Sequence, residues 1–176
     1  MERHNRLVRN ACPSAATAVS QSALYTAEER RRRDESGWTV VQGILAPLQF
    51  LVFLVSLFLV LQFLRTGAGE FAADASILAK TLTLYAIMVT GSIWEKEVFG
   101  RWLFARPFFW EDVFSMVVIA LHTAYVVMLV AGLGSTETRM LVALAGYGAY
   151  VINAGQFLLK LRAARLEATR DMAVPG

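Results

Sequence analysis

Residues 43–64 read GILAPLQFLVFLVSLFLVLQFL, a run of 22 residues without a charged side chain. A helix of about 20 apolar residues spans the ~30 Å hydrocarbon core of a bilayer, so this run predicts a membrane-spanning helix. The composition of the whole chain agrees, because 56% of its 176 residues are hydrophobic and its mean hydropathy is +0.49. Such a chain is too apolar for an ordinary soluble domain and indicates an integral membrane protein.

Three further runs have a similar length and polarity: residues 75–94, 113–133 and 140–159. The first of them carries one charge, Lys80, which is near enough to the far interface to be expected to snorkel. The second has His122 near its middle. Four spans leave only short connections, which predicts one membrane domain over residues 24–168, folded as an all-α, antiparallel four-helix bundle. Loops are expected at the glycine-containing connections 65–74 and 134–139.

The two ends of the chain differ from the spans. Residues 1–23 are rich in Ala, Ser, Thr and Arg, which predicts a disordered tail, and residues 169–176 are expected to form a C-terminal tail. The sequence Thr26-Ala-Glu-Glu predicts a capping box, in which Thr26 and Glu29 satisfy each other's backbone N–H groups. A short charged helix is expected to follow as far as Glu35 and to lie along the membrane surface.

Basic residues alternate between the two sides of the spans. Fourteen of the seventeen Lys and Arg residues fall in the N-terminal segment, the loop between the second and third spans, and the C-terminal tail. Loops rich in Lys and Arg stay in the cytoplasm, so both termini and the central loop are predicted to be cytoplasmic. The run Arg30–Arg33 is interpreted as an anchor to anionic lipid and not as a nucleic-acid site.

Few residues suit metal or redox chemistry. The chain has one cysteine, Cys12, which excludes an intramolecular disulfide and an iron–sulfur ligand set. Its two histidines, His4 and His122, argue against a di-iron or zinc centre of the usual kind. No metal centre is therefore expected. The sequence also lacks a Gly-rich phosphate loop, so no organic cofactor is expected either.

The loop between the second and third spans has an unusual composition. Residues 94–112 read WEKEVFGRWLFARPFFWED and hold four acids, three bases and seven of the chain's twenty aromatic residues. A simple membrane connection needs only a few polar turn residues. Carboxylates, bases and aromatic rings at the point where two apolar helices meet water suit a binding site for a large, flat, amphipathic ligand.

Polar side chains within the spans extend this site. Lipid makes such side chains costly unless they face the bundle interior. Glu111, Ser115 and His122 fall within about 40° of one another at ~100° per residue. Further polar residues lie in the first and fourth spans: Gln49, Asn153, Gln156 and Lys160. Most of them lie in the cytoplasmic half, which predicts a pocket open to that leaflet with His122 at its floor.

Each of these residues also has a structural interpretation. Three of them can serve as interhelical hydrogen-bond partners worth about 0.6 kcal/mol each: Gln49, Asn153 and Gln156. Glu111 and Asp112 suit the positive end of a helix dipole, and Asp112 suits an N-cap. A lone histidine such as His122 is commonly a packed structural residue.

Four segments together resemble a known family: VQGILAPLQFLVFLVS (41–56), LYAIMVTGSIWEKEVFG (84–100), FFWEDVFSMVVIALHTAY (108–125) and AYVINAGQFLLKLRAARLEA (149–168). Over residues 24–168 the chain resembles the 3-vinyl bacteriochlorophyllide hydratases of phototrophic bacteria. The resemblance implies a hydro-lyase of bacteriochlorophyll synthesis in the bacterial inner (intracytoplasmic) membrane. It would convert the 3-vinyl group of chlorophyllide a, or of a bacteriochlorophyllide, to a 3-(1-hydroxyethyl) group. No catalytic residues are transferred from the family.

Chemistry then assigns roles to the residues. Hydration of a vinyl group needs a proton at the terminal carbon and water at the inner carbon. Desolvation favours the protonated form of a carboxyl, so Glu95 or Glu111 is predicted to donate the proton, with Asp112 as second choice. His122 is predicted either to orient the water or to ligate the magnesium of the substrate as a neutral imidazole.

The ring and its propionate need their own contacts. Aromatic side chains of the central loop are predicted to pack on the ring face: Trp94, Trp102, Phe108, Phe109 and Trp110. A base of the same loop is predicted to pair with the propionate: Lys96, Arg101 or Arg106. Four polar residues of the spans complete the predicted substrate contacts: Gln49, Ser115, Asn153 and Gln156.

The main alternative function is a non-enzymatic carrier or assembly factor that holds chlorophyllide and hands it to other membrane enzymes. It needs the aromatic and basic residues but no proton donor. A small transporter is disfavoured by four spans without an obvious inverted repeat. The expected partners are therefore chlorophyllide, water, the lipid bilayer and other enzymes of bacteriochlorophyll synthesis, with no role for nucleic acid.

Overall fold

Four long helices form most of the protein. The computed structural model describes residues 24–173, in which the long helices are α3 (Gly37–Thr66), α4 (Glu70–Phe99), α5 (Phe109–Val130) and α6 (Thr136–Ala173). A short helix, α2 (Ala27–Glu35), precedes them, and a 3-10 turn, η1 (Arg106–Phe108), leads into α5. Each long helix contains a segment long and apolar enough to cross a membrane. The predicted all-α, four-span fold is confirmed, whereas the tail predicted for residues 1–23 lies outside the described residues.

Local signals fix the start of the described chain. The capping box is confirmed, because Glu29 N donates to Thr26 Oγ1 at 3.2 Å and Thr26 N donates to Glu29 Oε2 at 2.8 Å. The helix α2 ends at Glu35 as predicted. Its C-cap, Ser36, also caps α3 and donates to Glu97 Oε2 of α4 at 2.7 Å, so the short helix is fixed to the bundle.

The connections between the spans differ in their limits from those that the sequence predicts. The prediction of a loop over residues 65–74 is wrong for its second half, because α4 begins at Glu70, directly after Gly69. The third span ends at Val130 and not at Leu133. Hydropathy locates the part of a helix that lies in lipid, whereas the backbone can continue its helical hydrogen bonds through polar residues beyond that part.

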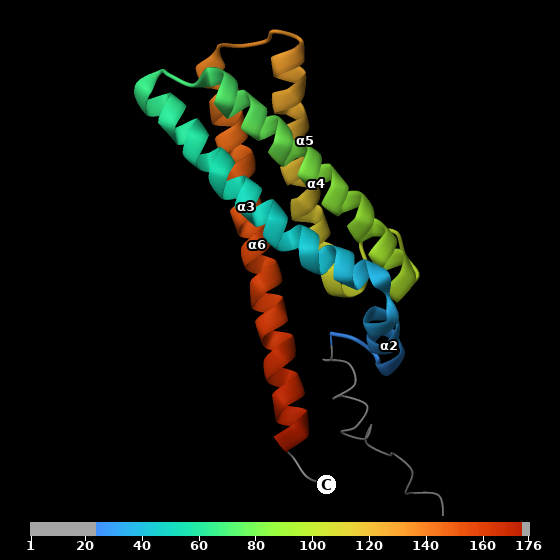
Figure 1. Cartoon of the computed structure of the whole chain (residues 1–176). Coiled ribbons are helices and arrows are strands. Elements are labelled where there is room, and N and C mark those ends of the chain that lie inside the picture. The colour runs from blue at the N-terminus through green and yellow to red at the C-terminus, as the bar shows by residue number, and fades with distance from the viewer. Residues whose placement is uncertain (1–23, 174–176) are drawn as a thin grey trace, which may run out of the picture.

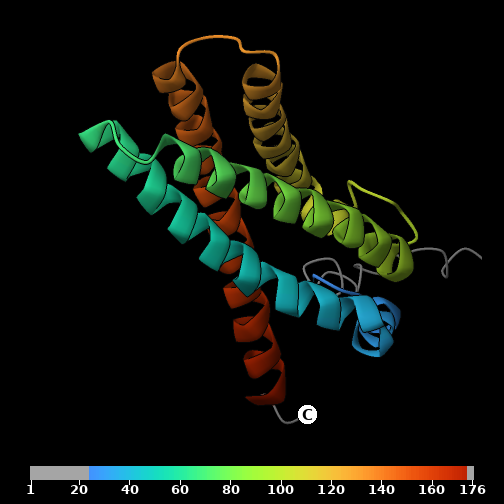
Figure 2. The same cartoon turned by 45° about the horizontal axis from the view of Figure 1, so that its top comes forward.

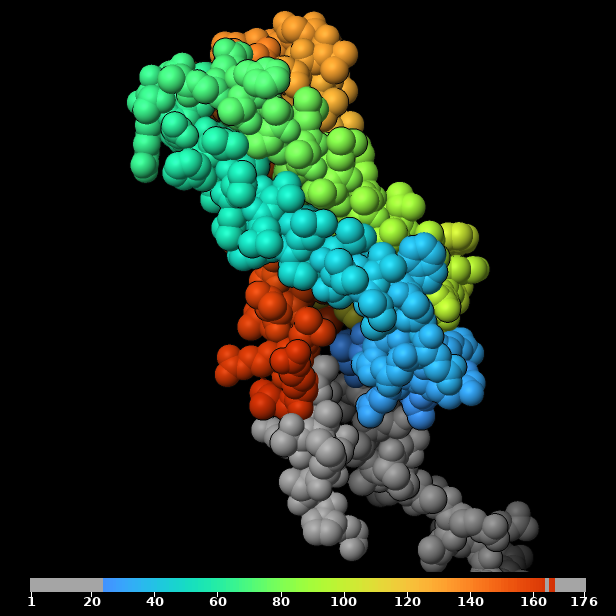
Figure 3. Space-filling model, viewed as in Figure 1, coloured from blue at the N-terminus to red at the C-terminus, as the bar shows by residue number. Residues whose placement is uncertain are grey.

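The helices pair as two antiparallel hairpins. One consists of α3 and α4, and the other of α5 and α6. Both hairpin turns lie at one end of the molecule, whereas α2 and the connection between α4 and α5 lie toward the other end (Figures 1 and 2). The α3–α4 hairpin crosses α6 obliquely, and α6 continues past the crossing as a projecting helix (Figures 1 and 3).

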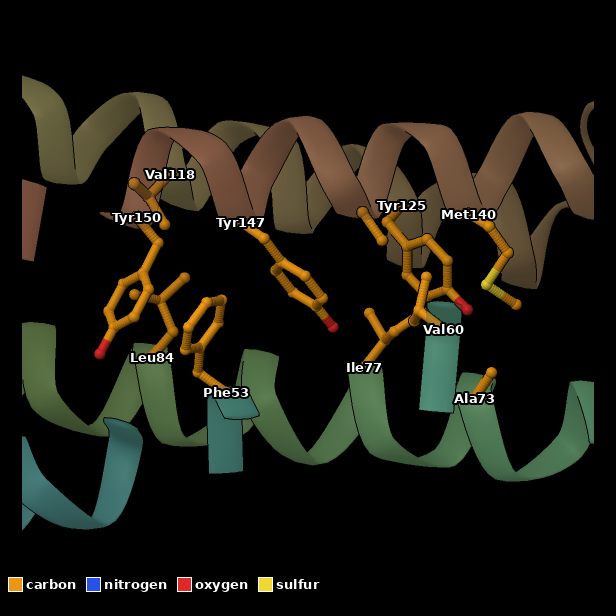
Figure 4. Packing of buried hydrophobic residues seen from close by; sticks show 11 residues of the cluster. Phe53, Val60, Ala73, Ile77, Leu84, Val118, Tyr125, Met140, Tyr147 and Tyr150 are labelled. Atoms are coloured by element: carbon orange, nitrogen blue, oxygen red, sulfur yellow. The ribbon is translucent and has the colours of Figure 1, made fainter. Parts of the chain in front are cut away.

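The core between the hairpins combines apolar packing with buried hydrogen bonds. Phe53, Tyr147 and Tyr150 meet where α3 crosses α6, and the ring centroids of Phe53 and Tyr150 are 4.9 Å apart (Figure 4). The Tyr147 hydroxyl is 2.5 Å from Ser56 Oγ, which is 2.8 Å from Ser76 Oγ. Such hydrogen bonds join helices where lipid offers no competing partner.

Lys80 departs from its predicted position. Its side chain is fully buried, and Nζ lies 3.9 Å from the centroid of the Tyr150 ring. The prediction that it snorkels to the far interface is therefore wrong. Lys80 is the eleventh residue of α4, about 15 Å from the start of the helix at ~1.5 Å per residue, and it faces α6 instead of lipid.

Candidate functional site

Two carboxyl side chains meet beneath the connection between α4 and α5. Glu95 and Asp112 are each 5% exposed and lie near facing ends of these helices. Consecutive backbone N–H groups hold them, since Phe104 N donates to Asp112 Oδ2 at 2.6 Å and Ala105 N donates to Glu95 Oε2 at 3.2 Å. The two carboxyl groups are also close enough to each other to interact. Two ionised carboxylates in such a buried site repel each other, which favours the retention of a proton by the pair.

The loop backbone adopts an uncommon conformation to supply these donors. Among residues 24–173, Phe104 is the non-glycine residue with a positive φ, at 59°. A left-handed conformation costs a residue with a side chain about 1–2 kcal/mol. Hydrogen bonds from the backbone to carboxylates are strong enough to offset this cost. Strain held in this way is frequent at functional sites, which singles out the Glu95–Asp112 pair.

The third acid, Glu111, has a different partner. Lys160 Nζ of α6 lies 2.6 Å from Glu111 Oε1 and also donates to the Pro107 carbonyl. The same Nζ stands 4.9 Å from the centroid of the Phe108 ring. The acids predicted as one group are therefore a carboxyl pair and a separate ion pair. The sequence grouped Lys160 with the polar residues of the fourth span but gave it no catalytic or substrate-binding role.

The predicted aromatic contacts divide into two sets. Trp94 and Phe108 face inward, with ring centroids 5.7 Å apart, and they pack with three other rings: Tyr25, Phe99 and Phe157. This cluster joins the segment before α2 to α4, η1 and α6 at the end of the bundle. The other set is exposed: Trp102, Phe109 and Trp110. The predicted bases are exposed beside these rings, and Lys96 Nζ lies 5.7 Å from the Trp102 ring.

The predicted polar residues of α3, α5 and α6 lie inside the bundle. Asn153 Nδ2 donates to Ser115 Oγ at 2.8 Å, which confirms the interhelical hydrogen bond predicted as one alternative for Asn153. Three side-chain oxygens are buried and have no hydrogen-bond partner among residues 24–173: Gln49 Oε1, Asn153 Oδ1 and Gln156 Oε1. Interhelical hydrogen bonding therefore does not account for all their polar atoms.

His122 lies deep between α5 and α6. Its ring is fully buried, and Nδ1 is 2.8 Å from the Val118 carbonyl oxygen. A carbonyl only accepts, so Nδ1 carries the hydrogen and the neutral ring keeps its lone pair on Nε2. The ring packs on Gly146, because a Cβ at that residue would lie 2.9 Å from His122 Cε1. The absence of a side chain at Gly146 therefore lets α5 and α6 approach closely within the bundle.

This contact gives a matched pair of glycine variants. Gly146→Ala is expected to destabilise the protein by about 1–3 kcal/mol, because the new methyl group must displace the His122 ring. Gly148→Ala is expected to be neutral or stabilising, since its Cβ meets nothing within 4 Å and alanine favours helix. Thermal unfolding of the two variants in the same detergent measures the difference. Equal melting temperatures would contradict the close approach.

A groove lies outside the predicted site. It has a volume of about 340 Å³ and runs along the projecting part of α6, where Leu158, Leu161, Arg162, Arg165 and Leu166 line it. None of these residues was predicted to contact a ligand. The pocket predicted to have His122 at its floor stays a prediction. His122 itself is enclosed by its neighbours.

The sequence pattern of the 2-vinyl bacteriochlorophyllide hydratase (BCHF) family matches residues 25–163. This chain belongs to that hydratase family. A relative named 2-vinyl bacteriochlorophyllide hydratase from Rhodobacter capsulatus is 62% identical over 161 residues, covering 92% of this chain and 94% of the relative. A relative of the same name from Cereibacter sphaeroides is 64% identical over 150 residues, covering 85% of this chain and 93% of the relative. No solved structure matches the chain.

The family match covers the whole candidate site of this hydratase. Its limits enclose every predicted site residue from Gln49 to Asn153 and Gln156, and also Lys160. The 3-vinyl group of the macrocycle carries the number 2 in the family name. The resemblance stated from the sequence is confirmed.

Proposed function

We propose that this chain adds water across the vinyl group of a bacteriochlorophyllide to give a 1-hydroxyethyl group, the activity that the names of its relatives describe. The observation that carries the proposal is the buried Glu95–Asp112 pair, held by two backbone N–H groups and able to share a proton. A carrier needs no such proton source. The proposed enzyme is a hydro-lyase whose second substrate is water.

The carboxyl pair can supply and recover the proton of this reaction. One proton passes from the pair to the terminal vinyl carbon, which becomes a methyl group. Positive charge develops at the inner carbon and is shared with the conjugated macrocycle. The oxygen of water bonds to this carbon, and the surplus proton returns to the pair. The atoms of vinyl group and water are then all in the product, and the acid is regenerated.

The backbone donors stabilise the charge that appears on the pair. When the proton leaves, the pair gains one negative charge in a site with little access to water. Phe104 N–H and Ala105 N–H already point at the two carboxyl groups, so no rearrangement is needed at that moment. Fixed donors of this kind act most strongly in a desolvated site. Glu111 is less suited to give up a proton, because it is committed to Lys160.

The substrate ring is proposed to lie on the exposed aromatic set, Trp102, Phe109 and Trp110, with its propionate paired by a neighbouring base. Lys96, Arg101 and Arg106 are the bases of this surface. The carboxyl pair lies beneath the same loop, next to this surface. The loop then carries both the binding surface and the backbone donors.

His122 does not fit the role of orienting water at the same vinyl group. It is ten residues from Asp112 along α5, a separation of about 15 Å at ~1.5 Å per residue. The terminal and inner carbons of a vinyl group are bonded neighbours. One vinyl group therefore cannot contact both the carboxyl pair and His122.

We also propose an orientation for the four spans. Both termini and the Trp94–Asp112 loop face the cytoplasm, because the basic residues gather on that side. The exposed aromatic and basic surface then lies at the cytoplasmic interface of a bacterial inner membrane. A bacteriochlorophyllide could pass there to other enzymes of bacteriochlorophyll synthesis.

Incubation of the purified protein with chlorophyllide a in detergent or liposomes tests the function. A hydratase is expected to yield a pigment heavier by one water, and water labelled with ¹⁸O is expected to transfer its oxygen to that pigment. The exposed aromatic and basic surface would also suit a carrier. A stable pigment complex without any hydrated product would favour the carrier and contradict the proposed activity.

A further inference from the structure

Unpaired polar atoms gather along one part of the bundle interior. Within residues 24–173, seven side-chain atoms are buried and lack a hydrogen-bond partner. Six of them belong to residues spread from the bundle interior to the α4–α5 connection: Lys80, His122, Gln49, Asn153, Gln156 and Glu111. The seventh belongs to Arg139, near the opposite end. Each such atom costs about 1–3 kcal/mol when nothing satisfies it, so this concentration needs a physical cause.

The residues follow the seam between α5 and α6. Glu111 pairs with Lys160, and Ser115 pairs with Asn153 one turn farther in. His122 contacts Tyr147 another two turns along, with ring centroids 5.7 Å apart. These pairs follow an antiparallel register that varies by no more than about one turn. The seam therefore places polar groups at intervals over about 16 Å, the length of eleven residues of α5.

Two residues from other helices also face this seam. Lys80 of α4 reaches it through its contact with the Tyr150 ring. Gln49 of α3 lies one turn before Phe53, and Asn153 of α6 lies one turn after Tyr150. Because Phe53 and Tyr150 are in contact and the two helices run antiparallel, Gln49 and Asn153 lie on the same side of that contact.

The inner end of the seam combines a donor with an acceptor. Lys80 Nζ donates in either protonation state, whereas His122 Nε2 accepts, because Nδ1 carries the ring hydrogen. The two side chains are close enough to interact electrostatically. Water can accept from the lysine and donate to the imidazole at the same time. The amide and carboxylate oxygens farther along the seam are acceptors that water also satisfies.

We propose that the seam between α5 and α6 binds a file of water molecules that runs from Lys80 and His122 to Glu111. Its inner end is the Lys80–His122 pair, and its outer end lies beside the Glu95–Asp112 pair. The file supplies the reactant water to the site enclosed beneath the α4–α5 connection. That use of the water rests on the proposed function, whereas its binding does not.

X-ray radiolytic footprinting tests the binding of water, because radiolysis turns bound water into hydroxyl radicals that oxidise the adjacent side chains. The wild-type protein is expected to show oxidation of His122 and Tyr150, although both are buried. Lys80→Met removes the donor and is expected to reduce this oxidation several-fold. Met140 is fully buried away from the seam, so its oxidation should not change. Absence of His122 and Tyr150 oxidation in the wild type would overturn the proposal.

Two further variants guard against a general loss of structure. Thr81→Val changes the buried neighbour of Lys80, whose hydroxyl only donates to its own helix at Ile77 O, and should leave the footprint unchanged. Lys80→Gln keeps a donor and is expected to retain most of the oxidation. An undiminished footprint in folded Lys80→Met would also contradict the proposal. If that variant does not fold, the wild-type and Lys80→Gln footprints decide.

A measurement of activity distinguishes a failure of the water-file proposal from a failure of the proposed hydratase function. Lys80→Met is expected to lower kcat several-fold while KM for chlorophyllide stays constant, because the ring contacts are elsewhere. If the wild type shows the footprint but forms no hydrated pigment, the file is supported and the proposed function fails. If hydration is normal in Lys80→Met while its footprint is lost, the file binds water but does not supply the reaction.

Discussion

Glu95→Gln is expected to lower the rate of hydration by about 10²–10⁴-fold, the usual contribution of a general acid. The amide keeps the shape of the side chain, and its oxygen can still accept from Ala105 N. It can also donate to Asp112, so the local fold should remain intact. What the variant loses is the proton that the Glu95–Asp112 pair transfers. Hydrated pigment formed per unit time, measured at saturating chlorophyllide, reports this loss in kcat.

The neighbouring acid provides the matched control. Glu111→Gln makes the same chemical change on the same side of the bundle, but it removes a carboxylate that pairs with Lys160. It is expected to affect stability more than kcat. Asp112→Asn is expected to resemble Glu95→Gln, because either substitution removes one half of the pair. Wild-type rates in folded Glu95→Gln and folded Asp112→Asn would refute the carboxyl pair as the acid.

Hydropathy was sufficient to predict the spans, because the length of an apolar run is fixed by the thickness of the bilayer. The capping box at Thr26 and Glu29 was also predictable, since its hydrogen bonds involve only neighbouring residues. The limits of α4 were not predictable from hydropathy, because its helical hydrogen bonds continue beyond the lipid into polar residues. The position of the Lys80 side chain was not predictable for a different reason. It depends on a contact with the Tyr150 ring, which belongs to a helix distant in the sequence.

The candidate site was predicted in composition but not in its pairings. Glu95 or Glu111 was predicted as the acid, with Asp112 as second choice, because carboxylates beside apolar helices are uncommon. Their mutual contact depends on the loop conformation, and in particular on the positive φ of Phe104. A bulky residue gives no local signal for that conformation. The partner of Glu111 was likewise hidden, because a residue 49 positions later supplies it.

Lys160→Met is expected to destabilise the protein by about 3 kcal/mol, toward the lower end of the range for a broken buried ion pair. Glu111 is 5% exposed at its side chain and would lose its countercharge, whereas Lys160 is 24% exposed, which moderates the cost. The Pro107 carbonyl would lose its donor as well. Thermal unfolding in detergent, with the aromatic cluster as a fluorescence probe, measures the change.

The design of this test relies on two comparisons. Arg162→Met removes the same charge two residues later on an exposed part of α6 and is expected to change stability by no more than about 0.5 kcal/mol. The double variant Lys160→Met/Glu111→Leu removes both charges and is expected to recover most of the loss, since apolar groups can replace a buried pair at little cost. A double variant no more stable than Lys160→Met would show that the lysine acts through Pro107 and Phe108 and not through Glu111. In that case the contacts of Lys160 with Pro107 and Phe108, and not its charge pairing with Glu111, would hold the loop above the Glu95–Asp112 pair in position.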